Sequence, residues 1–219
     1  MEKPHPLKVI GIMIILFGLP LISWLFMKSG ADFRMNVINE LGQFGKIQNF
    51  DLLKSNGERF TQNDVSKKVL MVSFLPENFT VKSEKAQQLK WIQEQFQERL
   101  LKRSDFMVLS PIIVDSLSQL TKVKNGLDIE GGKFRRWEIV GGGKEILKDL
   151  GENGFYLPLK DGETVFDNPY LAIVDVDGEV RNFYNIFEKE EIAKMIMHLS
   201  LLLPPQDDRK VEIKTELEQ

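Results

Sequence analysis

The chain of 219 residues contains no cysteine and only two histidines, His5 and His198. The absence of cysteine excludes disulfides, thiolate nucleophiles, zinc–thiolate sites and iron–sulfur ligation together. Two histidines nearly exclude a His-rich metal site or a Ser–His–Asp triad. Positive charge is not in excess either, because 29 basic and 32 acidic residues give a net charge of −3. No domain-wide positive field is therefore available to hold nucleic acid through its phosphates.

One uncharged run of 19 residues, VIGIMIILFGLPLISWLFM at positions 9–27, lies near the N-terminus. About 20 apolar residues cross a bilayer core as a helix, so we expect a retained transmembrane anchor. Trp24 near one end is typical of a membrane interface. The alternative is a cleaved signal peptide with Ser29 and Ala31 as its cleavage pattern, although apolar cores of such peptides run about 7–15 residues. Two basic residues flank the run on each side, so charge alone does not give the topology.

The rest of the chain alternates strand and helix patterns. Continuous apolar runs at 68–75 and 106–114 predict strands covered on both faces. Apolar residues recur at helical spacing over 82–102, which predicts a helix between them. The other expected elements are two short strands around a turn at 55–57, a helix within 115–127, a strand ending at 142, a short helix over 144–154, a hairpin over 170–184 and a closing helix over 188–203. This order predicts an α/β fold whose sheet has parallel and antiparallel pairs, with helices on both faces.

Three motifs suggest chemistry but have simpler interpretations. GGGKEIL at 141–147 lacks the first glycine and the Ser or Thr of a phosphate loop, so a turn before a helix is expected. DVDGEV at 175–180 lacks ligands of a calcium loop, and a hairpin turn explains it. Met195 and His198 could share a helix face, but two ligands make an incomplete copper site, so we expect packing residues.

Several segments together resemble the Sco (SenC-type) family of membrane-anchored, thioredoxin-like proteins that bind copper and help to assemble cytochrome oxidase. The segment FDLLKSNGERFTQNDVSKKVLMVSF is similar to the family's opening hairpin and first central strand. RRWEIVGGGKEILKDLGENGF is similar to its Trp-containing strand, loop and short helix, and LAIVDVDGEVRNFYNIF is similar to its late hairpin. The resemblance covers most of residues 44–203 and implies a thioredoxin-like, Sco-type mixed sheet with flanking helices, preceded by one transmembrane helix. The expected organisation is a flank at 1–8, an anchor at 9–27, a juxtamembrane linker at 28–43, the thioredoxin-like domain at 44–203 and a polar tail at 204–219.

The departures from the family fall on its chemistry. The resemblance places the two C-x-x-x-C cysteines near Asn78 and Lys82, or near Phe79 and Ser83 after a shift of one position, and the metal-binding histidine near Asp167. None of these positions carries sulfur or imidazole, which copper(I) prefers over amide, ammonium and carboxylate. Thiol–disulfide exchange also needs a thiolate, and the chain has none. We therefore expect no cofactor, no metal site and no thiol redox activity.

The leading hypothesis is a membrane-tethered, non-catalytic Sco-like protein that binds a respiratory membrane complex or another assembly factor. The resemblance places its domain on the periplasmic side of a bacterial inner membrane, where tethering through residues 9–27 raises its effective concentration for membrane partners. The degenerate site is the candidate binding surface, with the alternative that these residues are merely solvated loops. Its residues are Pro76, Glu77, Asn78, Phe79, Thr80, Lys82, Asp167, Asn168 and Tyr170.

Two other functions remain open. A cysteine-independent enzyme or small-ligand carrier could use the thioredoxin-like cleft, where Glu77, Lys82 and Asp167 could converge. A well-formed pocket with a shifted pKa would favour it, and a flat apolar patch around Phe79 and Tyr170 would favour the binding module. The third is a structural subunit whose Pro20-containing helix packs inside a larger membrane complex.

Overall fold

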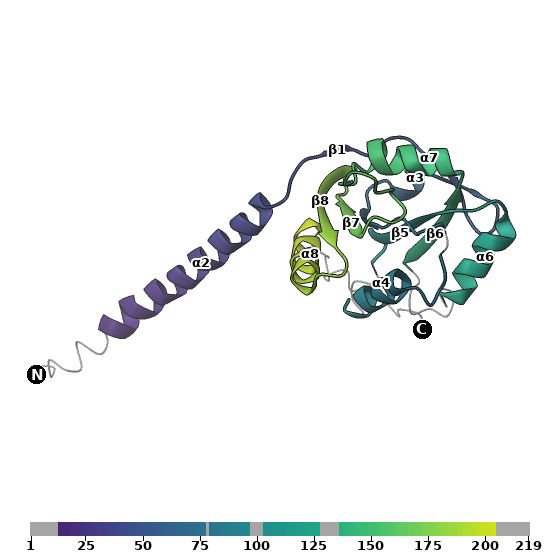
Figure 1. Ribbon diagram of the computed structural model, residues 1–219. Coiled ribbons are helices and arrows are strands. Elements are labelled where there is room, and N and C mark those ends of the chain that lie inside the picture. Colours follow the sequence, from purple (N-terminus) through teal and green to yellow (C-terminus); the bar gives the residue numbers. More distant parts are fainter. Residues whose placement is uncertain (1–12, 78, 97–102, 128–135, 205–219) are drawn as a thin grey trace, which may run out of the picture. The chain divides into compact units, whose positions relative to one another are not determined.

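The computed structural model describes residues 13–77, 79–96, 103–127 and 136–204. The chain divides into two compact units, residues 1–41 and residues 42–219. Both are drawn in Figure 1.

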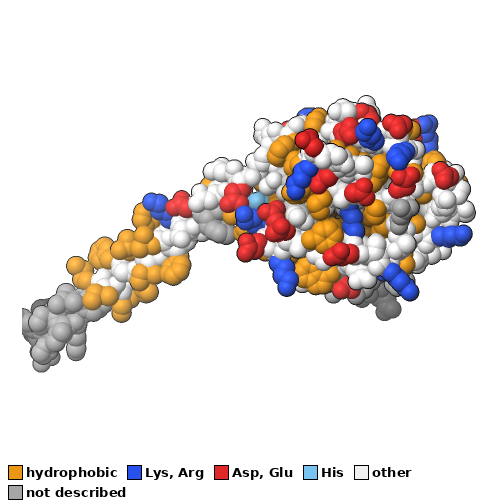
Figure 2. All heavy atoms as spheres, in the orientation of Figure 1, with side chains coloured by type: hydrophobic (Ala, Val, Ile, Leu, Met, Phe, Trp, Pro, Cys, Tyr) orange, Lys and Arg blue, Asp and Glu red, His pale blue; other side chains and the backbone are white. Residues whose placement is uncertain are grey.

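The first unit is a continuous helix formed by η1 (Ile14–Gly18), a π-helical segment, and α2 (Leu19–Asn39). Pro20 lies in the first turn of α2, where a proline lacks the N–H for a bond to the preceding turn and crowds its carbonyl. The π-helical segment directly before it is a local widening of the kind found where the regular ladder is interrupted. Residues Ile14–Asn39 are long and apolar enough to cross a membrane by length and composition. The helix continues through most of the predicted linker. Figure 2 shows exposed apolar side chains gathered on its N-terminal part, where the large apolar residues between Met13 and Met27 are more than half exposed.

The second unit contains an eight-stranded sheet in the order β1-β8-β7-β4-β5-β6-β2-β3. Its strands are β1 (Gly45–Lys46), β2 (Asp51–Leu53), β3 (Arg59–Thr61), β4 (Val69–Val72), β5 (Phe106–Ile113), β6 (Trp137–Gly142), β7 (Tyr170–Val174) and β8 (Glu179–Asn185). β4 pairs in parallel with β5 and antiparallel with β7, and β5 pairs in parallel with β6. The strand that begins at Val69 is therefore central, as the Sco-type interpretation requires.

Helices cover both faces of this sheet (Figure 1). The helical elements of the unit are α3 (Gln62–Val65), α4 (Glu84–Glu94), α6 (Leu117–Gly126), α7 (Lys144–Asp149), η2 (Leu150–Gly154) and α8 (Lys189–Leu202). Apolar residues of α4, α6 and α8 form one core layer with alternate strand residues, and those of α3, α7 and η2 form the other. Because successive strand residues face opposite sides, the unbroken apolar runs in β4 and β5 are what a sheet covered on both faces requires.

The predicted mixed α/β architecture is confirmed, with differences at element ends. The helix expected over 82–102 extends from Glu84 to Glu94, and residues 97–102 lie outside the described range. Pro111 lies inside β5 opposite Val140, within the strand predicted over 106–114, although a proline often marks the end of a strand or an irregularity in it. Its carbonyl accepts a hydrogen bond from the Leu75 amide, and the pairing of β5 with β6 continues past it to Ile113.

Candidate functional site

The first part of the candidate site is the loop that joins β4 to α4, residues 76–83, here called the α4 loop. Before it, the Leu75 amide donates to the Pro111 carbonyl at 2.9 Å, so the chain still runs beside β5. The chain then turns, and α4 begins after Ser83, whose Oγ accepts from the Ala86 amide at 3.3 Å. The α4 loop thus lies at the carboxyl end of the central parallel strands, where open α/β sheets bind their ligands.

The second part is residues 164–169, here called the β7 loop because it leads into β7. It is a compact turn in which the Thr164 hydroxyl donates to the Asp167 carboxylate at 2.9 Å. Asn168 is buried, and its side-chain amide donates to a backbone carbonyl ten residues earlier at 2.7 Å. Its Oδ1 accepts from the Tyr170 amide at 2.9 Å. Asn168 is therefore an internal brace of the loop, and its side chain is not available to a partner.

Lys85, in the first turn of α4, connects the two loops. Its side chain is buried, and its ammonium donates to the backbone carbonyl of Asn168 at 2.7 Å and to that of Phe166 at 3.4 Å. Burial lowers the pKa of Lys85 from 10.5 to about 8, and the negative charge of Asp167 opposes that shift. The charged lysine is thus held in a poorly solvated position that lowers its proton affinity.

A second lysine reaches the same region from α7. Lys144, the residue after three successive glycines, donates to the Glu77 carboxylate at 2.9 Å, and both side chains are about half exposed. The hydrogen bond and charge of Glu77 raise the pKa of Lys144, with a smaller contribution from Asp167. Acidic and basic groups therefore alternate across the site, from Glu77 through Lys144 and Asp167 to Lys85. The glycine-rich motif contributes a surface ion pair, and no phosphate-loop pattern is present.

The predicted surface residues fall into three groups by exposure. Glu77, Thr80, Lys82 and Asp167 are exposed, whereas Pro76, Phe79 and Tyr170 are partly buried and Asn168 is buried. Asn78 lies outside the described residues. Glu77 is bonded to Lys144, and Asp167 acts electrostatically on Lys144 and on Lys85. Among the described residues no hydrogen bond or ion pair joins Lys82 to Glu77 or to Asp167, so the convergence of these three residues stays a prediction.

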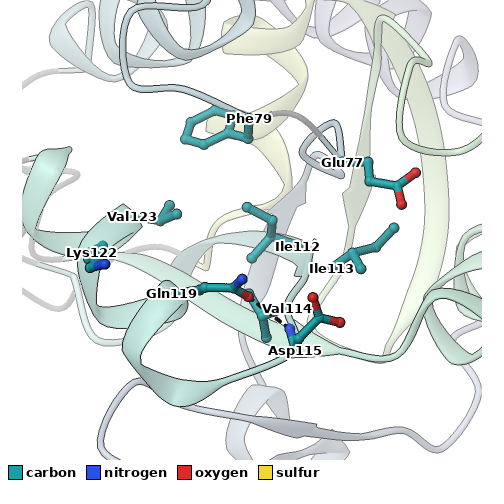
Figure 3. Close-up of a pocket in the computed structure, with 9 residues that line it drawn as sticks. All are labelled: Glu77, Phe79, Ile112, Ile113, Val114, Asp115, Gln119, Lys122 and Val123. Carbon is teal, nitrogen blue, oxygen red and sulfur yellow. Dashed lines mark hydrogen bonds between the residues drawn. The ribbon is translucent and has the colours of Figure 1, made fainter.

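A pocket of about 360 Å³ opens beside the α4 loop (Figure 3). Its apolar lining comes from Phe79 in the α4 loop, from the end of β5 and from α6. Its polar lining residues are Glu77, Asp115, Gln119 and Lys122. The Asp115 amide donates to the Gln119 Oε1 at 2.9 Å, which fixes one side of the opening (Figure 3). The lining residues are Glu77, Phe79, Ile112, Ile113, Val114, Asp115, Gln119, Lys122 and Val123.

Sequence reasoning did not identify Lys85, although the sequence carries a signal for it. Leu89, Ile92 and Phe96 lie at offsets of four, seven and eleven from Lys85 and face the core. A residue at such an offset shares the buried face of the helix. A lysine in an apolar stripe predicts a buried cation with internal acceptors. The partners of Lys85 are about 80 positions away, and nothing local predicts them.

The residues at the family's ligand positions do not fit a copper(I) site. Lys82 and Asp167 offer an ammonium and a carboxylate, whereas soft copper(I) prefers thiolate and imidazole. Met195 and His198 lie in the core, and His198 Nδ1 is 2.5 Å from the Tyr184 hydroxyl. Within the described ranges, no cluster of three or more His, Asp or Glu side chains is placed to hold a metal.

Comparison with known proteins gives a likeness of fold. No protein-family model and no curated protein matches the chain. Among solved structures, BsSco, a member of the Sco family of cytochrome c oxidase assembly proteins, is 16% identical with a TM-score of 0.57, covering 73% of this chain and 95% of its own. A SCO1/SenC family lipoprotein from Bacillus anthracis is 17% identical with a TM-score of 0.57, covering 72% of this chain and 94% of its own.

The likeness extends to thioredoxin-family proteins beyond Sco. A thiol:disulfide interchange protein from Chlorobium tepidum is 15% identical with a TM-score of 0.51, covering 73% of this chain and 96% of its own. The chain therefore has a thioredoxin-like fold of the Sco type, and the predicted resemblance is confirmed in fold. At these identities the comparisons establish the architecture alone, so function has to be argued from the site.

Proposed function

We propose that this chain is a membrane-tethered, non-catalytic Sco-like protein that binds a respiratory membrane complex or one of its assembly factors. The α4 loop and the β7 loop together form the docking surface. Its exposed or partly buried members among the described residues are Pro76, Glu77, Phe79, Thr80, Lys82, Asp167 and Tyr170. The domain would lie on the periplasmic side of a bacterial inner membrane, tethered through residues 9–27.

The observation that carries this proposal is the way in which the two loops are joined. Their connection is the ammonium of Lys85, which donates to two backbone carbonyls of the β7 loop. A redox centre needs a thiolate, and a soft metal centre needs ligands with free electron pairs. A protonated lysine that is already bonded supplies neither, which supports a docking surface at this end of the sheet in preference to a redox or copper centre.

The surface also has groups that suit protein recognition. Phe79 on the α4 loop and Tyr170, the first residue of β7, are partly exposed aromatic residues, and aromatic residues are enriched among binding hot spots. The pocket beside Phe79 could receive an apolar side chain of a partner. The Glu77–Lys144 ion pair on the rim is exposed and would contribute more to partner choice than to affinity.

Crosslinking in the native membrane, followed by mild-detergent purification of the tagged full chain and mass spectrometry, tests the proposal. A double variant, Phe79→Ala with Tyr170→Ala, removes the two aromatic groups. Phe44→Ala is the matched control, because Phe44 is an exposed aromatic residue next to the edge strand β1. Recovery of oxidase subunits or assembly factors with the wild type and the control, but not with the double variant, supports the proposal. Equal recovery with all three chains contradicts it.

A ligand carrier is the second candidate function, and the pocket is the observation that favours it. A volume of about 360 Å³ lies at the small end of the range for ligand sites, and a lining of five apolar residues with four polar or charged ones suits a small polar molecule that has an apolar part. Val123→Phe would narrow the pocket from α6. A compound that raises the melting temperature of the wild type but not of Val123→Phe would favour this function.

A further inference from the structure

We propose that Lys85 is a positioning residue of the docking surface: it couples the β7 loop to α4, so that both loops present one fixed arrangement to a partner. This inference rests on the proposed function, because it concerns the assembly of the same surface. Lys85 itself is buried and touches no partner, so it acts through the loops that it joins.

The hydrogen bonds of Lys85 bridge segments 83 positions apart in the sequence. Within the described residues, they are the hydrogen bonds found between α4 and the β7 loop. The loop's other bonds run within itself, to the segment just before it, or to the end of β8, where the Ile186 amide donates to the Pro169 carbonyl. Without Lys85, the β7 loop keeps its internal turn but loses its polar connection to α4.

The chemistry of this contact separates positioning from direct recognition. Lys85 bonds to backbone carbonyls, so its removal takes no side chain away from the docking surface. Asp167 is the charged group that acts on Lys85 from the β7 loop, and it is also close enough to influence Lys144 at the start of α7. On the α4 side, the neighbouring charged residues Lys82 and Glu84 are exposed.

The absence of native cysteine allows a direct test of loop opening in the purified full chain. Val165→Cys places a single thiol in the β7 loop, at a position that is fully buried. Val174→Cys places one in β7, also fully buried, and reports opening of the whole domain. Thiol labelling rates are measured for each reporter with wild-type Lys85, with Lys85→Met and with Lys82→Met, which changes an exposed lysine nearby.

Labelling at position 165 should become at least tenfold faster in Lys85→Met, while position 174 and the Lys82→Met chains keep their rates. Lys85→Ala provides a chemical rescue, because n-propylamine matches the atoms that the substitution removes. The amine should restore slow labelling at 165 in Lys85→Ala and have no effect in Lys85→Met. An unchanged rate at 165 in Lys85→Met, or equal acceleration at both reporters, would overturn the proposal.

The link to partner binding is tested separately. Lys85→Met should lose the crosslinked partner although every residue of the docking surface is intact, and Lys82→Met serves as the comparison. Full recovery of the partner with a mobile β7 loop would refute the positioning role and leave the docking function standing. Loss of binding in the Phe79 and Tyr170 double variant tests docking itself, so failure of one proposal is distinguishable from failure of the other.

Discussion

The burial of Lys85 predicts an unusual dependence of stability on pH. The pKa of Lys85 is about 8 in the folded chain and close to 10.5 when the residue is exposed by unfolding. Since a tenfold change in proton affinity is equivalent to about 1.36 kcal/mol, this lowering of the Lys85 pKa corresponds to roughly 3 kcal/mol in the free energy of unfolding. Between these pH values the unfolded state binds more protons than the folded state, so the free energy of unfolding rises with pH. Below pH 8 both states are protonated, and the full cost of burying the charge is present.

Urea unfolding of the full chain in mild detergent, followed by circular dichroism from pH 7 to 10.5, measures this effect. The informative quantity is the difference in unfolding free energy between the wild type and Lys85→Met, because other titrating groups cancel in it. That difference should shift by about 3 kcal/mol in favour of the wild type as pH rises through the window. Lys82→Met should show no such shift, since Lys82 is exposed. A difference between wild type and Lys85→Met that stays constant with pH would refute the argument from burial.

Three further substitutions test the electrostatics and the loop. Glu77→Gln removes the exposed ion pair with Lys144 and should leave the unfolding free energy almost unchanged in urea titrations, because solvent screens the two charges. The hydrogen bonds of Arg103 lower the pKa of Asp105, and burial opposes this. The ionised Asp105 therefore stabilises the fold above about pH 4, and this stability is lost as the pH falls further. Asp105→Asn should be less stable than the wild type near neutral pH, and the acid unfolding curves of the two chains should converge at low pH. Asn168→Ala breaks two internal hydrogen bonds of the buried brace and should lower stability by about 2–4 kcal/mol, measured by thermal or urea unfolding.

The fold could be predicted from the sequence because the patterns that indicate its strands and turns lie within short segments. Apolar runs of strand length predicted β4 and β5, and the Asp177–Gly178 turn predicted the hairpin of β7 and β8, where Gly178 has a φ of +76°. The strand predicted over 106–114 is present as β5 although it contains Pro111: prolines are usually found at strand ends or bulges, but the neighbours of Pro111 pair with β6 up to Ile113. That outcome depends on the adjoining strands and is not encoded near the proline.

The candidate site could be predicted only in part from the sequence, because its contacts join segments that are far apart in the chain. The resemblance brought the α4 loop and Asp167 together, and the structure places them in one region through Lys85 and Lys144. The sequence could not show that the Asn168 side chain would turn inward, because its partners are backbone groups whose positions follow from the fold. The pocket likewise needs β5, α6 and the α4 loop side by side, and these elements become neighbours only in the folded chain.

The buried lysine bears on why the site has this form. Lys85→Met would relieve about 3 kcal/mol of charge burial near neutral pH but would leave two carbonyl groups short of a donor, at about 1–3 kcal/mol each. These terms nearly cancel, so global stability gives little reason to keep a lysine at this position. A methionine would fill the same part of the core at similar volume. A methionine cannot donate hydrogen bonds to the carbonyls of the β7 loop. The position of the β7 loop relative to α4 is therefore the property that we expect to depend on Lys85.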